Sequence, residues 1–152
     1  MTIELTYNAS IKQPNILWKF HAPWTWVDFY DALDEQRKLL AGVSQRIDLI
    51  VDLNDAYPLP KYLLQHFFFV AHNENVTPFK DSYMVVVGAN AFLRMIGAVM
   101  LRHFPMAGHG LRFATSQRDA ADVLTELYLR DDYEKMMVTY LDSMIPTPSA
   151  QV

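Results

Sequence analysis

The chain of 152 residues contains no cysteine. It therefore has no disulfide framework, no thiolate nucleophile and no sulfur-ligated metal site. Basic charge is also scarce, because 13 Lys and Arg residues stand against 17 Asp and Glu residues and give a formal net charge of −4. Nucleic-acid binding requires a clustered basic face, so this charge balance argues against that class of function.

Long apolar runs are missing as well. The most apolar segment, residues 89–104, is interrupted by Asn90, Arg94, Arg102 and His103, and it is shorter than the roughly 20 residues that span a bilayer. The first eight residues, MTIELTYN, contain neither the basic region nor the apolar region of a signal peptide. We therefore expect a cytoplasmic protein that is neither exported nor inserted in a membrane.

Glycine is rare, with five residues in the chain. Gly88-Ala89-Asn90 is the one place where a phosphate-binding loop could begin, and neither a Gly-x-Gly-x-x-Gly nor a Walker pattern follows it. Gly88 therefore indicates a tight turn between a strand and a helix. Nucleotide binding receives little support from this sequence.

Apolar residues are plentiful, at 51% of the chain, with 13% aromatic and 20% charged residues. A chain of this length buries roughly 68–70% of its unfolded surface without disulfides or metals. No repeat, linker or low-complexity segment divides it. We therefore predict a single domain over residues 1–145 and a flexible Pro- and Ser-containing tail over residues 146–152.

Five segments have the pattern of strands: residues 2–9, 16–21, 46–53, 82–88 and 111–115. The first two alternate apolar and polar residues and are expected to form a hairpin. The segment 82–88 contains Met-Val-Val-Val and is apolar on both faces, which predicts the central buried strand.

Five segments have the pattern of helices: residues 25–42, 60–73, 89–104, 116–129 and 133–144. Thr25 with Asp28, and Ser116 with Asp119, have the spacing of capping boxes at helix starts. Gly42 is expected to end the first helix, since glycine is common just past a helix C-terminus.

Strands that alternate with helices predict an α/β fold with a mostly parallel five-stranded sheet after the N-terminal hairpin. One sheet face is expected to be apolar, with Trp18, Phe20, Ile47, Leu49, Val51 and Leu53. The other face is semi-polar, with Lys19, His21, Asp48, Asp52 and Arg112. Helices should therefore lie largely on the first face, and the extra C-terminal helix should be what covers the second.

No residue set has the spacing of a catalytic or metal site. The five histidines are scattered, and His66 and His72 are six residues apart, which does not place them on one helix face. No serine lies in a Gly-x-Ser-x-Gly elbow. We therefore expect no enzymatic activity, no cofactor and no bound metal.

Asp52 is the one acidic residue that resembles a phosphoacceptor, because it ends a strand as in a receiver domain. The acidic pair that would hold magnesium and the lysine that would pair with the phosphate are both missing. A receiver-like or nucleotide-binding signalling domain therefore remains the alternative class, and a structural aspartate that caps a loop is the favoured interpretation.

The helix predicted at residues 89–104 has almost no polar face, so more than one of its sides must be covered. Phe67-Phe68-Phe69 poses the same problem, because three consecutive residues span about 200° of a helix. A ligand or partner surface is therefore predicted on these two helices, at Phe67, Phe69, Val70, Phe92, Arg94, Met95, Ile96, Val99 and Met100. Ordinary core packing of the same residues is the competing interpretation.

The order of elements resembles a known family. Residues 46–53 with their acidic loop, Tyr83–Gly88, Phe92–Phe104, Leu111-Arg112-Phe113 and the SQRDAADVL segment at 116–124 resemble the SpoIIAA-like branch of the bacterial STAS fold. The resemblance implies a mixed sheet, no catalysis, and binding of a partner protein or a small ligand. Some members are likened to the CRAL-TRIO lipid carriers. The phosphorylatable serine of true antagonists has no counterpart in Asp52–Pro60, which contains no Ser or Thr.

These patterns together predict a non-enzymatic STAS-like binding module for a protein partner or a small apolar ligand. An acyl chain is one such ligand, with Arg94 or Arg102 positioned to hold its head group. A homodimer is expected to cover the aromatic surface of residues 62–69 and 92–104.

Overall fold

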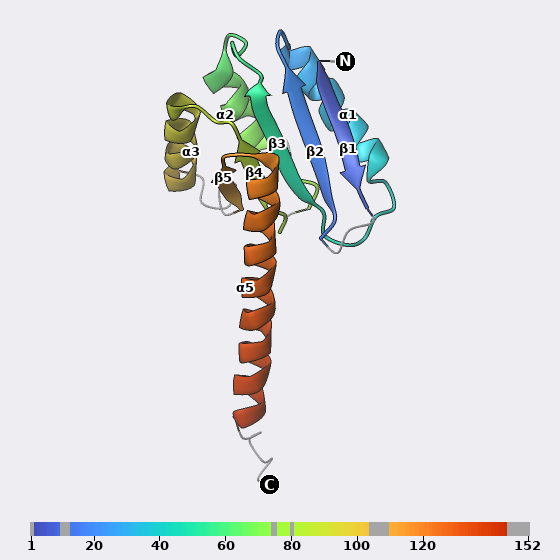
Figure 1. Cartoon of the computed structure of the whole chain (residues 1–152), viewed down its shortest axis with the longest axis vertical. Coiled ribbons are helices and arrows are strands. Elements are labelled where there is room, and N and C mark those ends of the chain that lie inside the picture. The colour runs from blue at the N-terminus through green and yellow to red at the C-terminus, as the bar shows by residue number, and fades with distance from the viewer. Residues whose placement is uncertain (1, 10–12, 74–75, 80, 104–109, 146–152) are drawn as a thin grey trace.

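The computed structural model of the chain describes residues 2–9, 13–73, 76–79, 81–103 and 110–145 (Figure 1). Within these ranges the fold is α/β, with a five-stranded mixed sheet and four helices. The elements are, in order, β1 (Ile3–Asn8), β2 (Asn15–His21), α1 (Trp26–Leu39), β3 (Asp48–Asp55), α2 (Leu63–Asn73), β4 (Met84–Val87), α3 (Ala91–His103), β5 (Leu111–Ala114) and α5 (Gln117–Met144).

The strands lie in the order β1-β2-β3-β4-β5. β1 pairs with β2 antiparallel, and β2, β3, β4 and β5 pair in parallel, as the hairpin and the alternating pattern predict. The prediction that 82–88 forms the central strand is wrong, because β3 lies at the centre and β4 lies next to the edge strand β5. β4 is apolar on both sides because helices cover both faces of the sheet there.

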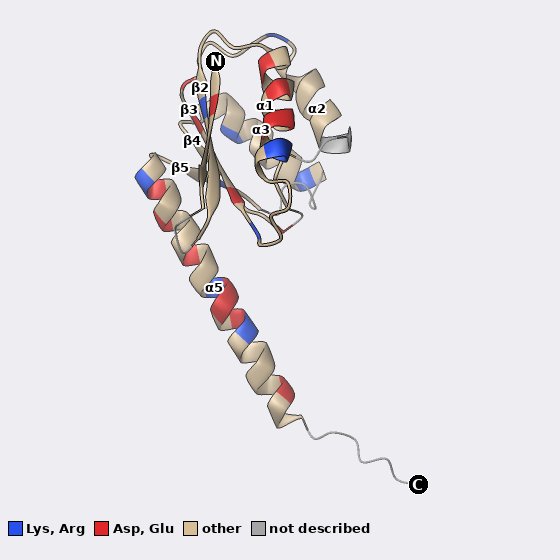
Figure 2. Ribbon diagram, turned by 90° about the vertical axis from the view of Figure 1, so that its right-hand side faces the viewer, with Lys and Arg blue, Asp and Glu red and all other residues tan. Residues whose placement is uncertain are grey.

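Helices α1, α2 and α3 cover one face of the sheet, and α5 lies against the other (Figure 2). The first face buries Trp18, Phe20, Leu49 and Val51 against α1, as the alternating pattern predicts. The second face buries Ile50, Val85 and Val87 against α5. The fold therefore has three layers.

The tryptophan indoles are all paired on the α1 side of the sheet. Trp18 donates to the Oε1 atom of Gln36 at 2.7 Å, Trp24 donates to the Ala56 carbonyl at 3.0 Å, and Trp26 donates to the Lys61 carbonyl at 2.8 Å. Buried indole N–H groups need such partners. These bonds attach α1 and the segment before α2 firmly to the sheet.

The capping box at the start of α1 is confirmed, with Thr25 and Asp28 bonded reciprocally. The second box is only half correct. Ser116 Oγ accepts from the Asp119 N–H at 3.0 Å, but the Asp119 carboxylate accepts from the N–H of Thr115, one residue before the cap. Gly42 lies past the end of α1 with φ +82°, a left-handed conformation that glycine adopts easily.

The prediction of two separate helices at 116–129 and 133–144 is wrong, because α5 is one helix of 28 residues. Neither Gly nor Pro occurs between Gln117 and Met144, so nothing in the chain interrupts the helix. The polar sheet face is covered by the first half of this helix, at Ala120, Leu124 and Leu127, rather than by an added C-terminal helix.

Three predictions lie outside the described residues: the end of the apolar helix at Pro105, most of the turn at 108–110, and the flexible tail at 146–152. The helix predicted from residue 60 begins at Leu63. No helix in the described ranges is long and apolar enough to cross a membrane.

Candidate functional site

A shallow pocket lies between α2 and α3, on the sheet face opposite α5. Its volume is about 130 Å³. Eight side chains line it, and all are apolar: Leu64, Phe67, Phe68, Phe92, Met95, Ile96, Val99 and Met100. We call this set the α2–α3 groove.

The packing of α3 explains why the groove is open. Its buried residues are Leu93, Ile96 and Gly97. A Cβ atom at Gly97 would lie 2.7 Å from the Phe113 ring, so a side chain here would displace that ring, and glycine lets α3 lie close to β5. Met95 and Val99 point elsewhere and stay 56% and 45% exposed. The helix thus has two apolar sides, and its own domain covers only one.

The structure gathers six of the nine predicted surface residues around the groove: Phe67, Phe92, Met95, Ile96, Val99 and Met100. Three do not line it. Val70 is buried in the core, Phe69 packs edge-on against Tyr30 with ring centroids 6.2 Å apart, and Arg94 lies over the Phe113 ring at 5.2 Å. Leu64 and Phe68, which the prediction left out, do line it.

The charge of this surface has one sign. Neither α2 nor α3 contains an Asp or Glu residue. Arg102 and His103 lie in the last turn of α3, and both are exposed. A ligand with acidic groups beside an apolar face would therefore meet no repulsion from these two helices.

The second half of α5 is a further apolar surface, and it extends away from the sheet (Figures 1 and 2). We call residues 132–144 the arm. Its apolar residues at helical spacing form the arm stripe: Tyr133, Met136, Met137, Tyr140, Leu141 and Met144. The members exposed by more than half are Tyr133, Met136, Tyr140, Leu141 and Met144.

The arm stripe does not continue the sheet-facing side of α5. At 3.6 residues per turn, Tyr133, Met136 and Tyr140 fall on the opposite side of the helix from Leu124 and Leu127. The sheet-facing line continues past Leu127 mainly through charged residues. The apolar side of the helix therefore changes over where the helix leaves the sheet.

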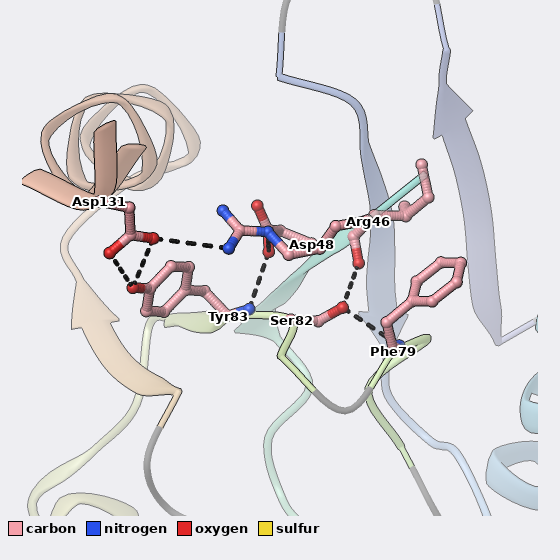
Figure 3. Close-up of polar contacts among 7 residues, drawn as sticks. Arg46, Asp48, Phe79, Ser82, Tyr83 and Asp131 are labelled. Atoms are coloured by element: carbon pink, nitrogen blue, oxygen red, sulfur yellow. Dashed lines mark hydrogen bonds and ion pairs between the residues drawn. The ribbon is translucent and has the colours of Figure 1, made fainter. Parts of the chain in front are cut away.

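A polar cluster marks the point of departure (Figure 3). Arg46 forms ion pairs with Asp48 at 3.6 Å and with Asp131 of α5 at 3.5 Å. Its guanidinium lies 4.4 Å from the Tyr128 ring centroid and 5.1 Å from that of Tyr83. We call these five residues the Arg46 clip.

Tyr83 completes the clip by donating its hydroxyl proton to Asp131, 3.0 Å and 3.1 Å from the two carboxylate oxygens. Its backbone N–H donates to Asp48 at 2.8 Å. The clip ties α5 to the sheet at residue 131. Beyond that point, the described hydrogen bonds and ion pairs of α5 run within the helix itself.

Burial raises the pKa values of three residues of the clip. It raises the pKa of Tyr128 to about 12, and the nearby Asp48 carboxylate adds to the rise. Burial also raises the pKa of Tyr83, and Asp131 acts in the same direction. The pKa of Asp48 is raised by burial, against the opposing effect of its hydrogen bonds and of Arg46. Both tyrosines therefore remain protonated well above neutral pH.

Asp52 has a structural environment. It is 4% exposed, and its oxygens accept from the Asn54 N–H at 3.0 Å and from the Gln117 side chain at 2.7 Å. The first bond is the local cap predicted for this loop, and the second joins β3 to the start of α5. A phosphoacceptor carboxylate must be open to its phosphodonor, whereas this one is buried and accepts hydrogen bonds at both oxygens.

Within the described ranges, no three His, Asp or Glu side chains lie close enough together to hold a metal ion. A scan against known protein families finds no match for this chain, and a search of curated proteins finds no relative. The two apolar surfaces are therefore the features of the described residues that point to a function.

The arm is the surface that sequence reasoning missed. The spacing of its apolar residues predicts a separate helix that packs on the domain. The sequence signal that could have found the arm is the position of the apolar residues around the helix axis. Ala120, Leu124 and Leu127 lie along one side of the helix. Tyr133, Met136 and Tyr140 lie along the opposite side. A continuous helix with such a change cannot bury both lines against the same sheet.

Proposed function

We propose that this protein is a non-catalytic binding module whose α2–α3 groove receives the apolar face of a helix from a protein. The observation that supports this most directly is the groove itself, an open apolar hollow between two helices. Amphipathic helices bind in such grooves through apolar side chains at i, i+3, i+4 and i+7.

The size of the groove favours a protein segment over a small molecule. Its volume of about 130 Å³ is well below the roughly 300–1,000 Å³ of typical ligand sites. A cavity of that size suits one or two inserted side chains, whereas a whole acyl chain needs more room. Binding of an acyl chain is therefore the second candidate function. A lipid that co-purifies with the protein in native mass spectrometry would make it the first.

The charge around the groove favours an acidic partner helix, because Arg102 is exposed at the end of α3 and neither α2 nor α3 contains an acidic residue. Electrostatic complementarity of this kind improves specificity and association rate. The preferred ligand is thus an amphipathic helix with Glu or Asp beside its apolar face.

Methyl NMR of the full chain with labelled methionines tests this proposal. The probe is a peptide of about 18 residues, long enough to form a helix, with Leu at i, i+3, i+4 and i+7 and Glu beside them. We expect shifts at Met95 and Met100, which line the groove, and none at Met84 in the sheet.

The matched controls are a peptide with Lys in place of Glu and the variant Val99→Glu. Each should weaken binding about tenfold, as for loss of an interface anchor. Shifts spread evenly over Met84, Met95 and Met100, or equal binding of both peptides, would contradict the proposal.

The order of strands and helices supports a SpoIIAA-like STAS fold, and the homodimer expected from the sequence fits a domain with uncovered apolar surface.

The environment of Asp52 speaks against the alternative class, a receiver domain. Incubation with acetyl phosphate and magnesium should leave the intact mass unchanged, and an adduct lost in Asp52→Asn would reinstate the receiver.

A further inference from the structure

Two exposed apolar surfaces of the chain differ in form. The α2–α3 groove is hollow and lies between two helices, whereas the arm stripe is a ridge on a single helix. The stripe presents Tyr133, Met136, Met137 and Tyr140 at the spacing with which helices insert side chains into grooves.

The two surfaces cannot meet within one chain. α5 lies on the sheet face opposite α2 and α3, and its arm runs away from the domain beyond the end of the sheet (Figures 1 and 2). The Arg46 clip fixes this direction, because it holds Asp131 and Tyr128 against the sheet. Any groove that receives this stripe therefore belongs to another molecule.

Their charges are complementary. The arm carries Asp132, Glu134 and Asp142 against a single basic residue, Lys135. The helices of the groove carry an exposed Arg102 in the last turn of α3 and no acidic residue. Bringing the arm to the groove therefore joins opposite net charges, whereas pairing two arms side by side would join like ones.

We propose that the arm of one copy of this chain docks in the α2–α3 groove of a second copy, and that the exchange is reciprocal. This inference rests on the proposed function and names its partner helix. The exchange closes a two-fold dimer in which each contact is made twice. It covers both apolar surfaces at once, which pairing of arm with arm does not.

Mixing of two double variants, each of which lacks one of the two surfaces, tests the exchange. In the full-length chain, Met136→Glu with Tyr140→Glu breaks the stripe, and Met95→Glu with Val99→Glu breaks the groove. All four positions are more than two-fifths exposed, so the monomer keeps its core. We expect the unaltered chain to be a dimer in light scattering and each double variant to be a monomer of 17.6 kDa.

An equimolar mixture of the two double variants should regain dimers. The arm of the groove variant is intact, the groove of the stripe variant is intact, and one of the two contacts can form. A dimer built from paired arms gives a different result, because the groove variant would stay dimeric. Such an outcome, or a monomeric unaltered chain at tens of micromolar, overturns the inference.

Matched controls lie on the same two helices. Val138 is 58% exposed on the sheet-facing line of the arm, and Leu101 is 41% exposed on the side of α3 away from the groove. Val138→Glu and Leu101→Glu should leave the dimer intact. If either dissociates the dimer as fully as the stripe and groove variants do, the contact is not the one inferred.

The lack of cysteine allows a second measurement that does not depend on glutamate substitutions. A chain with Met136→Cys mixed with a chain with Met95→Cys should form a mixed disulfide under mild oxidation, and Val138→Cys should form several-fold less. Crosslinking of Met136→Cys chains only with each other would instead identify pairing of arms.

The peptide titration separates this inference from the proposed function. It is repeated on the stripe variant, whose groove is free of the second copy's arm. If that variant binds the peptide while the unaltered chain is a monomer, the groove function stands and the exchange fails. If the variant does not bind the peptide at Met95 and Met100, the groove function itself fails.

Discussion

The two halves of α5 have similar apolar content and opposite environments. Residues 117–131 lie on the sheet, with Leu124 2% and Leu127 7% exposed. In residues 132–144, Tyr140 is 57% and Met144 is 63% exposed. Helix propensity and length are shared by both halves, so neither explains the difference. It arises from which side of the helix carries the apolar residues.

The comparison shows that one continuous helix can be core in one half and exposed apolar surface in the other when its apolar side changes over. The first half is part of the domain core, and the Arg46 clip ends that part at Asp131. The second half is mostly exposed and should therefore contribute little to the stability of its own domain. Substitutions in the two halves should therefore separate folding from association.

The largest difference is expected for one leucine in each half. Leu124→Ala removes a side chain buried against β4 and should lower the free energy of unfolding by about 3 kcal/mol. Leu141→Ala, at 53% exposed, should change it by less than about 0.5 kcal/mol. Urea unfolding at a concentration low enough for the monomer measures both. Equal losses would show that the arm packs on its own domain.

The next difference concerns two arginines that pair with acids. Arg46→Met leaves Asp48 and Asp131 near the sheet without their cation and should cost about 2 kcal/mol. Arg130→Met removes an exposed pair with Glu134 at 3.9 Å and an interaction with Tyr83, and should cost less than about 1 kcal/mol. The same unfolding experiment applies, and a negligible effect of Arg46→Met would mean that the clip does not hold α5.

The clip should also make the domain sensitive to alkali. The folded-state pKa of Tyr128 is about 12, above the value of 10 for a free tyrosine. A raised pKa contributes stability that is complete below pH 10 and is lost as the pH rises to about 12. We expect Tyr128→Phe to remove part of this loss and Tyr133→Phe in the arm to leave it unchanged. Unfolding across this pH range, with tyrosinate absorbance, tests the difference.

The smallest difference is expected at the two serines near the ends of α5. Ser116 caps the helix through the Asp119 N–H, so Ser116→Ala should cost about 1 kcal/mol. Ser143 donates to the Tyr140 carbonyl on an exposed surface, and Ser143→Ala should be nearly neutral. Hydrogen exchange of the two helix ends would show the same asymmetry, and comparable protection changes at both would contradict it.

Local patterns in the sequence predict much of this fold. Alternation in residues 2–9 and 16–21 gives the hairpin, and Thr25 with Asp28 gives the start of α1. Position within the sheet is harder to predict, since β4 is apolar on both faces yet lies beside the edge strand. A strand that is apolar on both faces indicates that helices cover both faces of the sheet. It does not indicate how many strands lie on either side of it.

The residues of the candidate site also fall into those that the sequence could predict and those that only the packed structure places. Phe92, Met95 and Val99 line the groove because a helix without a polar face has more apolar surface than its own domain covers, and the sequence shows this excess. Val70 and Arg94 were misplaced with respect to the groove, because only the packed structure decides that Val70 faces the core and Arg94 lies over Phe113. The arm escaped prediction because Asp131 and Asp132 resemble a helix end, whereas Asp131 is bound by Arg46 and Tyr83.

The Arg46 clip also gives the molecule the mechanics of a lever. It is a fulcrum at residue 131, and the arm beyond it is roughly 20 Å long at 1.5 Å per residue. A rotation of about 10° at the fulcrum therefore displaces the far end by about 3 Å, more than half the pitch of a helical turn. Small changes in how Tyr83 and Tyr128 hold Arg46 would thus become displacements of about 3 Å at the far end of the arm.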